Sequence, residues 1–477
     1  MSTFGGLNSA YSGLVAARTQ IEVAGQNINN ATTPGYTRQR VSLSSIPPLG
    51  TVGRVAAPIG TPGNGVAVTG IARLGDSFLD SRVRSTVSAA SYSSIRASSL
   101  ATLEKSLNEP GDSGISATLG DFWGSWQGLS NNVGNEASAA VVIEGAKGLI
   151  AQIATGYSAA AGQWQAMRSN ADELATELNS AASQVAELNG LIRATLRSGG
   201  SANELIDHRN QLTTVISALS GGVVNERSDG TVDVLIGGNP IVSGTTANEV
   251  KVTGAYNIDA GPVQLEWSSR PGLAVSLEGG EIAGALSLLA QSNATGTGGA
   301  FAEAAASYNA LATSLSSQVN ALHSTGTTPT GAPVPPAPGL NFFGVSATGP
   351  AALGLSVIPT NSSGIATGAA GQGALDGSIA DAISQIADKA GSPDSLWGTF
   401  VGRVAVTTKG ELQQSKLADL SANSATAAQQ SNASVDIDEE NVNLLMAQTA
   451  YNGAARVFTA IDEMLDTLIN RTGLVGR

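Results

Sequence analysis

Apolar residues recur every seven positions near both ends of the chain. In the first segment the repeat and its flank place large side chains on one helical face, and these are Phe4, Leu7, Tyr11, Leu14, Ile21 and Ile28. This helix should end between Asn29 and Pro34–Gly35, because proline cannot continue a helix and glycine readily forms the turn. The last segment offers a broader apolar face, made of Leu444, Ala447, Tyr451, Ala454, Val457, Phe458, Ile461, Met464, Leu465 and Leu468. A face this wide requires a packing partner.

The strongest repeat lies between residues 143 and 195, where apolar side chains alternate at spacings of three and four. This pattern is a heptad seam, and at 1.5 Å per residue it predicts a helix roughly 80 Å long. A helix of that length does not fit inside a compact domain, so we expect an elongated molecule.

The pattern changes to a period of two after residue 222. Val232, Val234 and Ile236 alternate with polar residues, and Asp229–Gly230 is typical of a hairpin turn. We therefore expect a small β domain here. Just before it, Ser201 and Glu204 have the spacing of a capping box that would open a helix.

These patterns predict a mainly α fold with inserted β structure in an elongated, multidomain chain. The expected parts are a coiled coil of the two terminal helices (1–50 with 430–477), a long helical rod (51–221 with 281–325 and 393–429), a β domain (222–280) and a Pro/Gly-rich insertion (326–392). Periodicity alone leaves two interpretations of the terminal helices. They could simply close a common core, or they could form a coiled coil whose outer faces pack on neighbouring subunits.

Composition narrows the classes of function. The chain has 477 residues, a formal net charge of −13 and no cysteine. An acidic chain repels phosphate, which disfavours nucleic acid and membrane surfaces as partners. We find no apolar run of about 18 residues for a membrane span and no cleaved secretory signal at the N-terminus. A cytoplasmic protein and export by another route both remain open.

No set of residues converges on catalysis or metal binding. The segment 111–114 (Gly-Asp-Ser-Gly) has the sequence of the trypsin-like nucleophile loop, but that arrangement requires a histidine upstream. Both histidines, His208 and His323, lie downstream, and neither has a second ligand at metal-binding spacing. The acidic residues at 436–440 lack the spacing of a calcium loop and suit a helix N-terminus instead. We therefore expect no catalytic residue, no cofactor and no metal.

Several motifs resemble those of a known family. The segment 26–39, Gln-Asn-Ile-Asn-Asn-Ala-Thr-Thr-Pro-Gly-Tyr-Thr-Arg-Gln, resembles the signature that follows the first helix of bacterial flagellar rod, hook and hook-associated proteins. It contains Asn29, Pro34, Gly35 and Tyr36. The stretches 108–116, 437–440 and 462–468 resemble the hook-associated protein 1 (FlgK) branch of this family.

The resemblance implies a structural subunit of the flagellar hook–filament junction, outside the cell, assembled with copies of itself into a helical ring. Family members leave the cell uncleaved through the type III export channel, and a cytoplasmic chaperone binds the C-terminal helix, here about 440–469. Hook protein and hook-associated protein 3 would be neighbours, and the filament cap and flagellin indirect partners. The terminal residues named above would then mediate assembly. Alternatives are another axial protein, such as hook protein or hook-associated protein 3, or a secreted surface hydrolase or adhesin with helical stalks.

Overall fold

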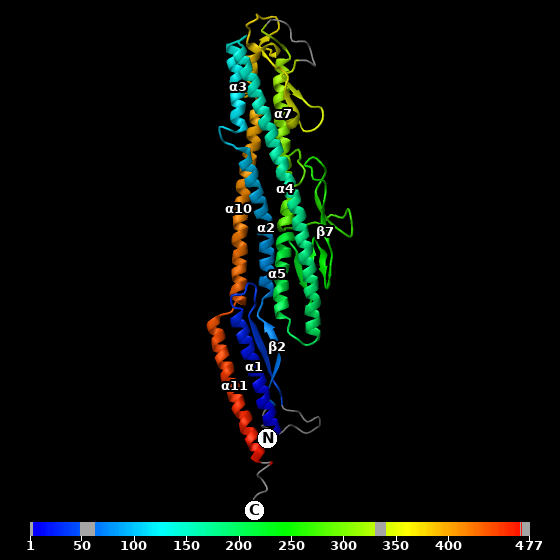
Figure 1. Cartoon of the computed structure of the whole chain (residues 1–477), viewed down its shortest axis with the longest axis vertical. Coiled ribbons are helices and arrows are strands. Elements are labelled where there is room, and N and C mark those ends of the chain that lie inside the picture. The colour runs from blue at the N-terminus through cyan, green and yellow to red at the C-terminus, as the bar shows by residue number, and fades with distance from the viewer. Residues whose placement is uncertain (1–2, 48–62, 330–339, 468, 470–477) are drawn as a thin grey trace, which may run out of the picture.

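The molecule is long and narrow, and both ends of the chain lie at the same end of it (Figure 1). The computed structural model describes residues 3–47, 63–329, 340–467 and 469. The chain leaves a terminal helix pair, passes along a helical rod to a distal tip, and returns through α10 (Pro393–Ala433) to α11 (Ile437–Asp466). The mainly α, elongated architecture expected from the heptad seam is therefore confirmed.

The rod is built around α4 (Glu136–Arg197), a single helix of 62 residues. At 1.5 Å per residue this helix is about 93 Å long. It packs against three shorter helices, which are α3 (Ile115–Asn131), α5 (Asn203–Ser220) and α7 (Ala300–His323). By length and composition alone, α4 is the one described helix that could cross a membrane. Its apolar composition is explained by the rod core, in which Ile153, Leu178 and Val185 are fully enclosed.

A second layer of the rod joins distant parts of the sequence. Helix α2 (Ser77–Leu107) runs along α10, and α6 (Gly280–Leu288) fits between α2, α4 and α5. Helix α10 begins with Pro393 in its first turn and is capped by Ser392, whose Oγ accepts from the N–H of Ser395. The proline start is favourable because the first helical N–H groups have no intrahelical acceptor.

The capping box expected at Ser201 and Glu204 is wrong. Helix α5 begins after Ala202 and has no side-chain cap. Glu204 instead accepts from Gln26 at 2.7 Å and from Gln39 at 3.2 Å, both in the N-terminal segment. Tertiary contacts with another part of the chain have replaced the local bond that the spacing suggested.

The β module lies on one side of the rod (Figure 1). Its four-stranded antiparallel sheet has the order β3-β4-β5-β6, with strands Val223–Glu226, Val232–Ile236, Asn239–Ser243 and Thr246–Ala247. A separate antiparallel pair consists of β7 (Val250–Thr253) and β8 (Gln264–Trp267). Val232, Val234 and Ile236 are all buried, as their alternation predicted.

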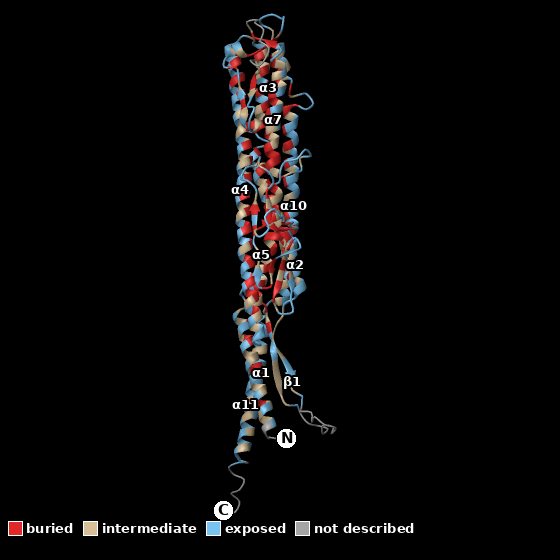
Figure 2. Ribbon diagram, turned by 90° about the vertical axis from the view of Figure 1, so that its right-hand side faces the viewer, coloured by how far each residue is buried: buried red, intermediate tan, exposed pale blue. Residues whose placement is uncertain are grey.

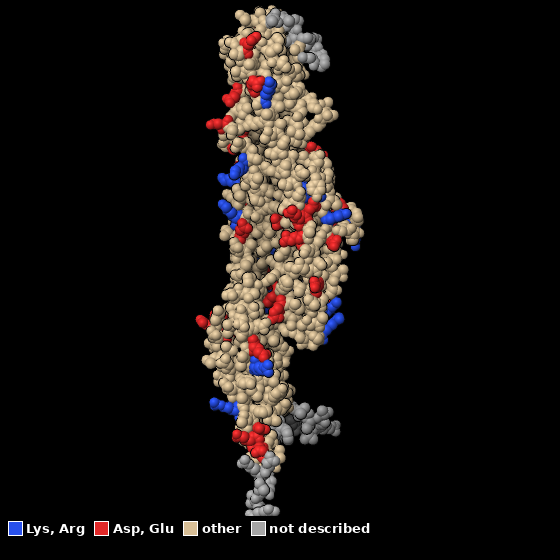
Figure 3. All heavy atoms as spheres, in the orientation of Figure 1, with Lys and Arg blue, Asp and Glu red and all other residues tan. Residues whose placement is uncertain are grey.

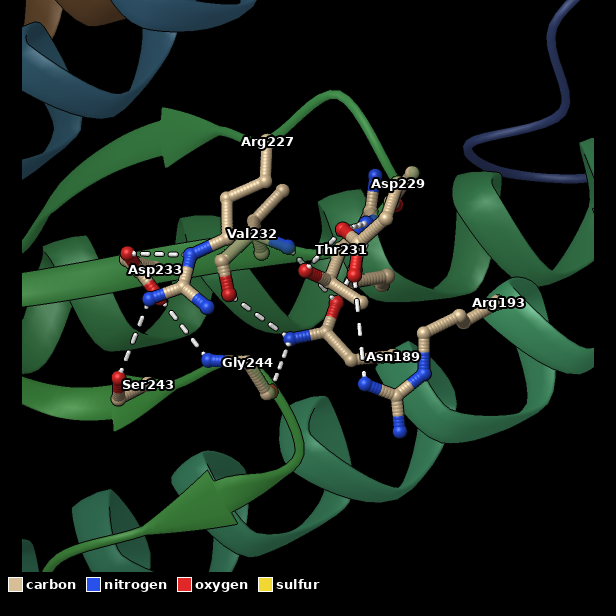
Figure 4. A network of polar contacts seen from close by, with 11 residues as sticks. Asn189, Arg193, Arg227, Asp229, Thr231, Val232, Asp233, Ser243 and Gly244 are labelled. Atoms are coloured by element: carbon tan, nitrogen blue, oxygen red, sulfur yellow. Dashed lines mark hydrogen bonds and ion pairs between the residues drawn. The ribbon is translucent and has the colours of Figure 1, made fainter.

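Polar side chains of α4 fasten the β module to the rod. Asn189, which is completely buried, donates to the carbonyls of Val232 and Gly244 at 2.8 and 2.7 Å and accepts from the Val232 N–H at 3.1 Å (Figure 4). Ten residues earlier, Asn179 forms the same two-way pair with the backbone of Val250. Each amide side chain takes the place of a neighbouring strand, so these backbone groups are satisfied without another β-strand.

The distal tip contains the Pro/Gly-rich region whose fold the sequence left open. Its small elements are β9 (Gly326–Thr327), β10 (Phe343–Val345), α8 (Ala351–Gly354), β11 (Leu355–Val357), a 3-10 turn (Ser362–Gly364), β12 (Gly368–Ala369) and α9 (Ser378–Ser384). They cover an aromatic cluster in which Trp126 and Phe342 stand edge to face, 5.1 Å apart. The buried His323 connects the layers, because one ring nitrogen faces the Leu340 carbonyl at 2.9 Å and Nε2 accepts from the Ala366 N–H.

The terminal pair consists of α1 (Thr3–Asn29) and α11, which pack side by side below the rod (Figure 1). A hairpin of β1 (Gln39–Ser45) and β2 (Val66–Arg73) packs on α1 and connects it to α2. Buried residues are concentrated in the rod, whereas the helix pair is mostly half-buried or exposed (Figure 2).

Candidate assembly interface

The helix pair buries one narrow seam. The buried and half-buried side chains of α11 repeat in heptads, and they include Glu440, Leu444, Ala447, Ala454, Phe458, Ile461 and Leu465. On α1 the corresponding half-buried residues are Leu7, Leu14, Ile21 and Ile28. A Cβ at Gly6 would lie 3.2 Å from Cδ1 of Ile461, so the two helices approach closely there. Most of the predicted assembly residues thus hold the two terminal helices together.

A second apolar stripe on α11 points away from α1. Val442, Met446, Val457 and Met464 are 57%, 58%, 52% and 60% exposed. Their separations of 4, 11 and 7 residues keep them on one side of a helix with 3.6 residues per turn. On α1, Tyr11 is similarly exposed. Four predicted assembly residues, Tyr11, Tyr451, Val457 and Met464, are therefore accessible, whereas the Phe4 side chain and Leu468 lie outside the described residues.

The motif after the first helix lies where the helix pair meets the rod. Gly35 has a φ of +77°, and a Cβ there would lie 1.9 Å from Nε2 of Gln211. Gln211, on α5, donates to the carbonyl of Pro34 at 2.8 Å. Glycine is required both by the left-handed backbone and by this close contact. Asn29 and Pro34 are exposed beside this turn. The motif therefore shapes an intramolecular joint.

Asn27 organises the joint from inside. Its Nδ2 donates to the Gln39 carbonyl at 2.9 Å and to Oε2 of Glu440 at 3.0 Å, and its Oδ1 accepts from the Gln39 N–H and the Tyr36 hydroxyl. Burial, followed by the charges of Glu204 and Asp207, raises the pKa of Tyr36 to about 12. Tyr36 therefore remains a neutral hydrogen-bond donor to Asn27.

Two ionic clusters connect the segments that meet at the joint. In one, Arg38 pairs with Glu440 of α11 at 2.6 Å and with Glu439 at 2.9 Å, while its N–H donates to the carbonyl of Ala433. The hydrogen bond to Glu439 is the main cause that raises the pKa of Arg38. Glu440 is only 3% exposed, so this ion pair fixes the start of α11 against the N-terminal segment.

The other cluster fixes the N-terminal segment to the rod. Arg73, at the end of β2, contacts Asp207 of α5 at 2.6 Å and Asp80 of α2 at 3.7 Å. Asp207 also accepts from the N–H of Thr37 at 3.0 Å, and Asp80 accepts from Gln429 of α10. Removing one partner from such a network leaves a poorly solvated charge, so the cluster should hold the helix pair at a defined angle to the rod.

This region has the properties of a structural joint. It combines exposed apolar stripes with buried polar clamps. Among the described residues, no group of three or more His, Cys, Asp or Glu side chains is placed to hold a metal ion. A cavity of about 580 Å³ lies beside the motif, lined by residues 30–37 and by parts of α2, α5 and α10.

Sequence reasoning missed the clamp residues Arg38, Arg73, Asp80, Asp207 and Glu440. One signal was available, because Glu440 occupies a heptad position of the seam that otherwise carries apolar residues. A charged residue at such a position indicates a buried partner. The identity of that partner, about 400 residues away in the chain, follows from no local pattern.

Comparison with known proteins agrees with this architecture. Residues 100–343, more than half of the chain, match the family model of the flagellar hook-associated protein FlgK helical domain. Residues 7–37 match the flagella basal body rod protein family, and residues 429–471 match the C-terminal family of the flagellar basal body rod FlgEFG proteins.

Individual relatives agree. The chain is 29% identical to flagellar hook-associated protein 1 of Bacillus subtilis (strain 168), with both chains covered completely. It is 30% identical to flagellar hook-associated protein 1 of Salmonella typhimurium over 248 residues, 51% of this chain and 43% of the relative.

The fold is also similar to that of a solved structure, the flagellar hook junction protein FlgK from Burkholderia pseudomallei. The TM-score is 0.63 at 15% identity, covering 74% of this chain and all of the other. The chain therefore belongs to the flagellar hook-associated protein FlgK family, whose members are structural components of the flagellar hook–filament junction.

Proposed function

We propose that copies of this chain assemble helically into a ring between hook and filament, with the α1–α11 pairs forming its inner wall. The observation that carries this proposal is the exposed stripe of Val442, Met446, Val457 and Met464, which faces away from α1. A subunit that repeats the same contact along a helix needs two different surfaces, one on each side. The buried seam holds the pair together, and the outer stripe remains for a neighbour.

The partners follow from this position. Hook protein would contact the ring on one side and hook-associated protein 3 on the other, with the filament cap and flagellin as indirect partners. The chain would leave the cell through the type III export channel without a cleaved signal. A cytoplasmic chaperone would cover the apolar C-terminal helix, about residues 440–469, before export. In this proposal the protein works by assembly and not as an enzyme.

A paired substitution tests the outer stripe. Val457→Asp with Met464→Asp places two charges on the exposed side, where they should leave the chain folded but block the ring. Gln448→Asp is the control, because Gln448 is exposed on α11 away from the stripe. Electron microscopy should show cells with hooks but few filaments for the double variant only. Normal filaments on those cells, with the variant present at the junction, would contradict the proposal.

The inner seam needs a separate test. Leu14→Asp or Phe458→Asp should separate α1 from α11 and stop incorporation, while the rod keeps its circular dichroism spectrum and unfolding midpoint. Immunogold labelling at the hook–filament boundary reports whether each variant reaches its place. Normal motility in either variant would refute the role of this seam.

A further inference from the structure

Helix α10 has two seams on opposite sides. The first is buried, mainly against α2, and consists of Trp397, Phe400, Val404, Thr408, Ser415, Ala418 and Ala425. Adjacent members are separated by three, four or seven residues, as expected for one side of a helix packed on another. This seam accounts for how α10 is held within the chain.

The second seam is exposed. Val406, Leu417 and Leu420 are 74%, 62% and 66% accessible. At about 100° per residue, Val406 lies roughly 200° around the helix axis from the buried Val404. Positions between them on this side, such as Gly410 and Gln413, are uncharged. Scattered single apolar residues on a surface are ordinary, but three large ones at separations of 11 and 3 residues form a line.

Two glycines border this line without an intramolecular reason. A Cβ at Gly402 or Gly410 would meet nothing within 4 Å, so neither is needed for packing inside the chain. They stand four residues before and after Val406, on the same side. Glycine within a helix is destabilising relative to alanine, and close approach of another backbone is a reason to keep it.

Helix α11 has the same design. Its outer stripe of Val442, Met446, Val457 and Met464 includes Gly453, where a Cβ would also meet nothing within 4 Å. Both helices lie along the same edge of the molecule, α10 above α11 (Figure 1). The exposed seam of α10 therefore extends the surface that the proposed function already assigns to subunit contact.

We propose that the exposed seam of α10, defined by Val406, Leu417 and Leu420, docks a helix of a second copy of this chain. The inference rests on the proposed function and extends the subunit contact from the helix pair onto the rod. Heptad-like spacing selects a helix as the occupant. Absence of charge along the seam matters because copies with a net charge of −13 repel one another elsewhere. Charged side chains are sparse and scattered on the face drawn in Figure 3.

Site-specific photo-crosslinking in flagellated cells tests the occupant. A photoreactive amino acid is placed at position 417, 412 or 464 of the full chain. Leu412 is a matched control, because it is a partly exposed leucine of the same helix, about 140° around the axis from Leu417. Position 417 should give a crosslinked product containing two copies of this chain, and position 412 should give none. A product of position 417 with a hook or filament protein alone, or no product, would overturn the inference.

Position 464 separates the two levels of the proposal. Crosslinking between copies at 464 without crosslinking at 417 would leave the proposed function standing and overturn only the α10 contact. Failure at both positions would overturn both.

A double substitution measures the effect of the seam. Leu417→Asp with Leu420→Asp should reduce the number of filaments per cell about tenfold, since each tenfold change corresponds to one lost apolar contact of ordinary strength. The unfolding midpoint of the monomer should be unchanged, because both residues are exposed in it. Leu412→Asp should assemble normally. A lower midpoint or a normal filament number in the double variant would count against the docking role.

Discussion

Helices α4 and α11 have the same heptad code and use it differently. Helix α4 is packed from several sides by α3, α5, α7 and the β module, and it buries a residue on almost every turn. Helix α11 packs on α1 alone among the major contacts, and of its described side chains only Glu440 and Ala447 are buried. The period therefore indicates that a helix packs, whereas the number of apolar sides compared with available partners indicates whether the partner is in the same chain.

The first prediction contrasts one leucine from each helix. Leu178→Ala on α4 should lower the free energy of unfolding by about 2–5 kcal/mol, because it leaves a cavity in an enclosed core. Leu445→Ala on α11 should change it by less than about 0.5 kcal/mol, since Leu445 is largely exposed. Urea denaturation of the full chain measures both. Equal losses would remove the distinction between the two regions.

A smaller effect is expected at the β module. Asn189→Ala would remove the partner of the Val232 N–H and of the Val232 and Gly244 carbonyls, and also one acceptor of Arg209. We expect a loss of about 1–3 kcal/mol, the cost of leaving buried polar groups unpaired. Hydrogen exchange should accelerate in β4 and β5. Gln184→Ala, at an exposed α4 position that contacts only Ser180 in the described hydrogen bonds, is the control. Unchanged exchange in β4 would show that the module is held without this amide.

The tip should respond to acid. Burial lowers the pKa of His323 below its ordinary value of 6.5, and Nε2 must stay unprotonated to accept from Ala366. The unfolded chain therefore binds a proton that the folded chain refuses, so stability is unaffected at higher pH and falls as the pH drops below about 6.5. The limiting slope is about 1.4 kcal/mol per pH unit. Unfolding of the wild-type chain and His323→Gln should differ in this slope between about pH 7 and pH 5. Parallel pH profiles would exclude a contribution from His323.

The smallest effect concerns the free monomer. The glycines of α1, the small polar residues at 421–434 and the wide apolar faces lead us to expect terminal helices that are largely disordered before assembly. Deletion of residues 1–35 and 435–477 should then change the helical circular dichroism signal very little. Loss of the full helical signal of the deleted residues would contradict this hypothesis and would mean that the narrow α1–α11 seam is sufficient by itself.

Much of the fold was predictable because its signals are local. Seven-residue spacing on α4 and two-residue spacing on β4 each reflect which side of an element is buried. Proline and glycine at 34–35 marked the end of the first helix for similar reasons. Prediction failed where a polar residue chose a distant partner. Glu204 was assigned to a local cap, yet it bonds Gln26 and Gln39, and no local rule ranks such alternatives.

The sequence by itself determined the helices, their apolar faces and the elongated shape, because periodicity depends only on neighbouring residues. Only the tertiary structure decided which faces are filled within the chain and which stay exposed. Phe458 and Val457 are adjacent and equally apolar, yet Phe458 is half-buried in the inner seam and Val457 is on the outer stripe. That division depends on where α1 lies, and α1 is held there by Asn27, Arg38 and Glu440, whose contacts join the two ends of the chain.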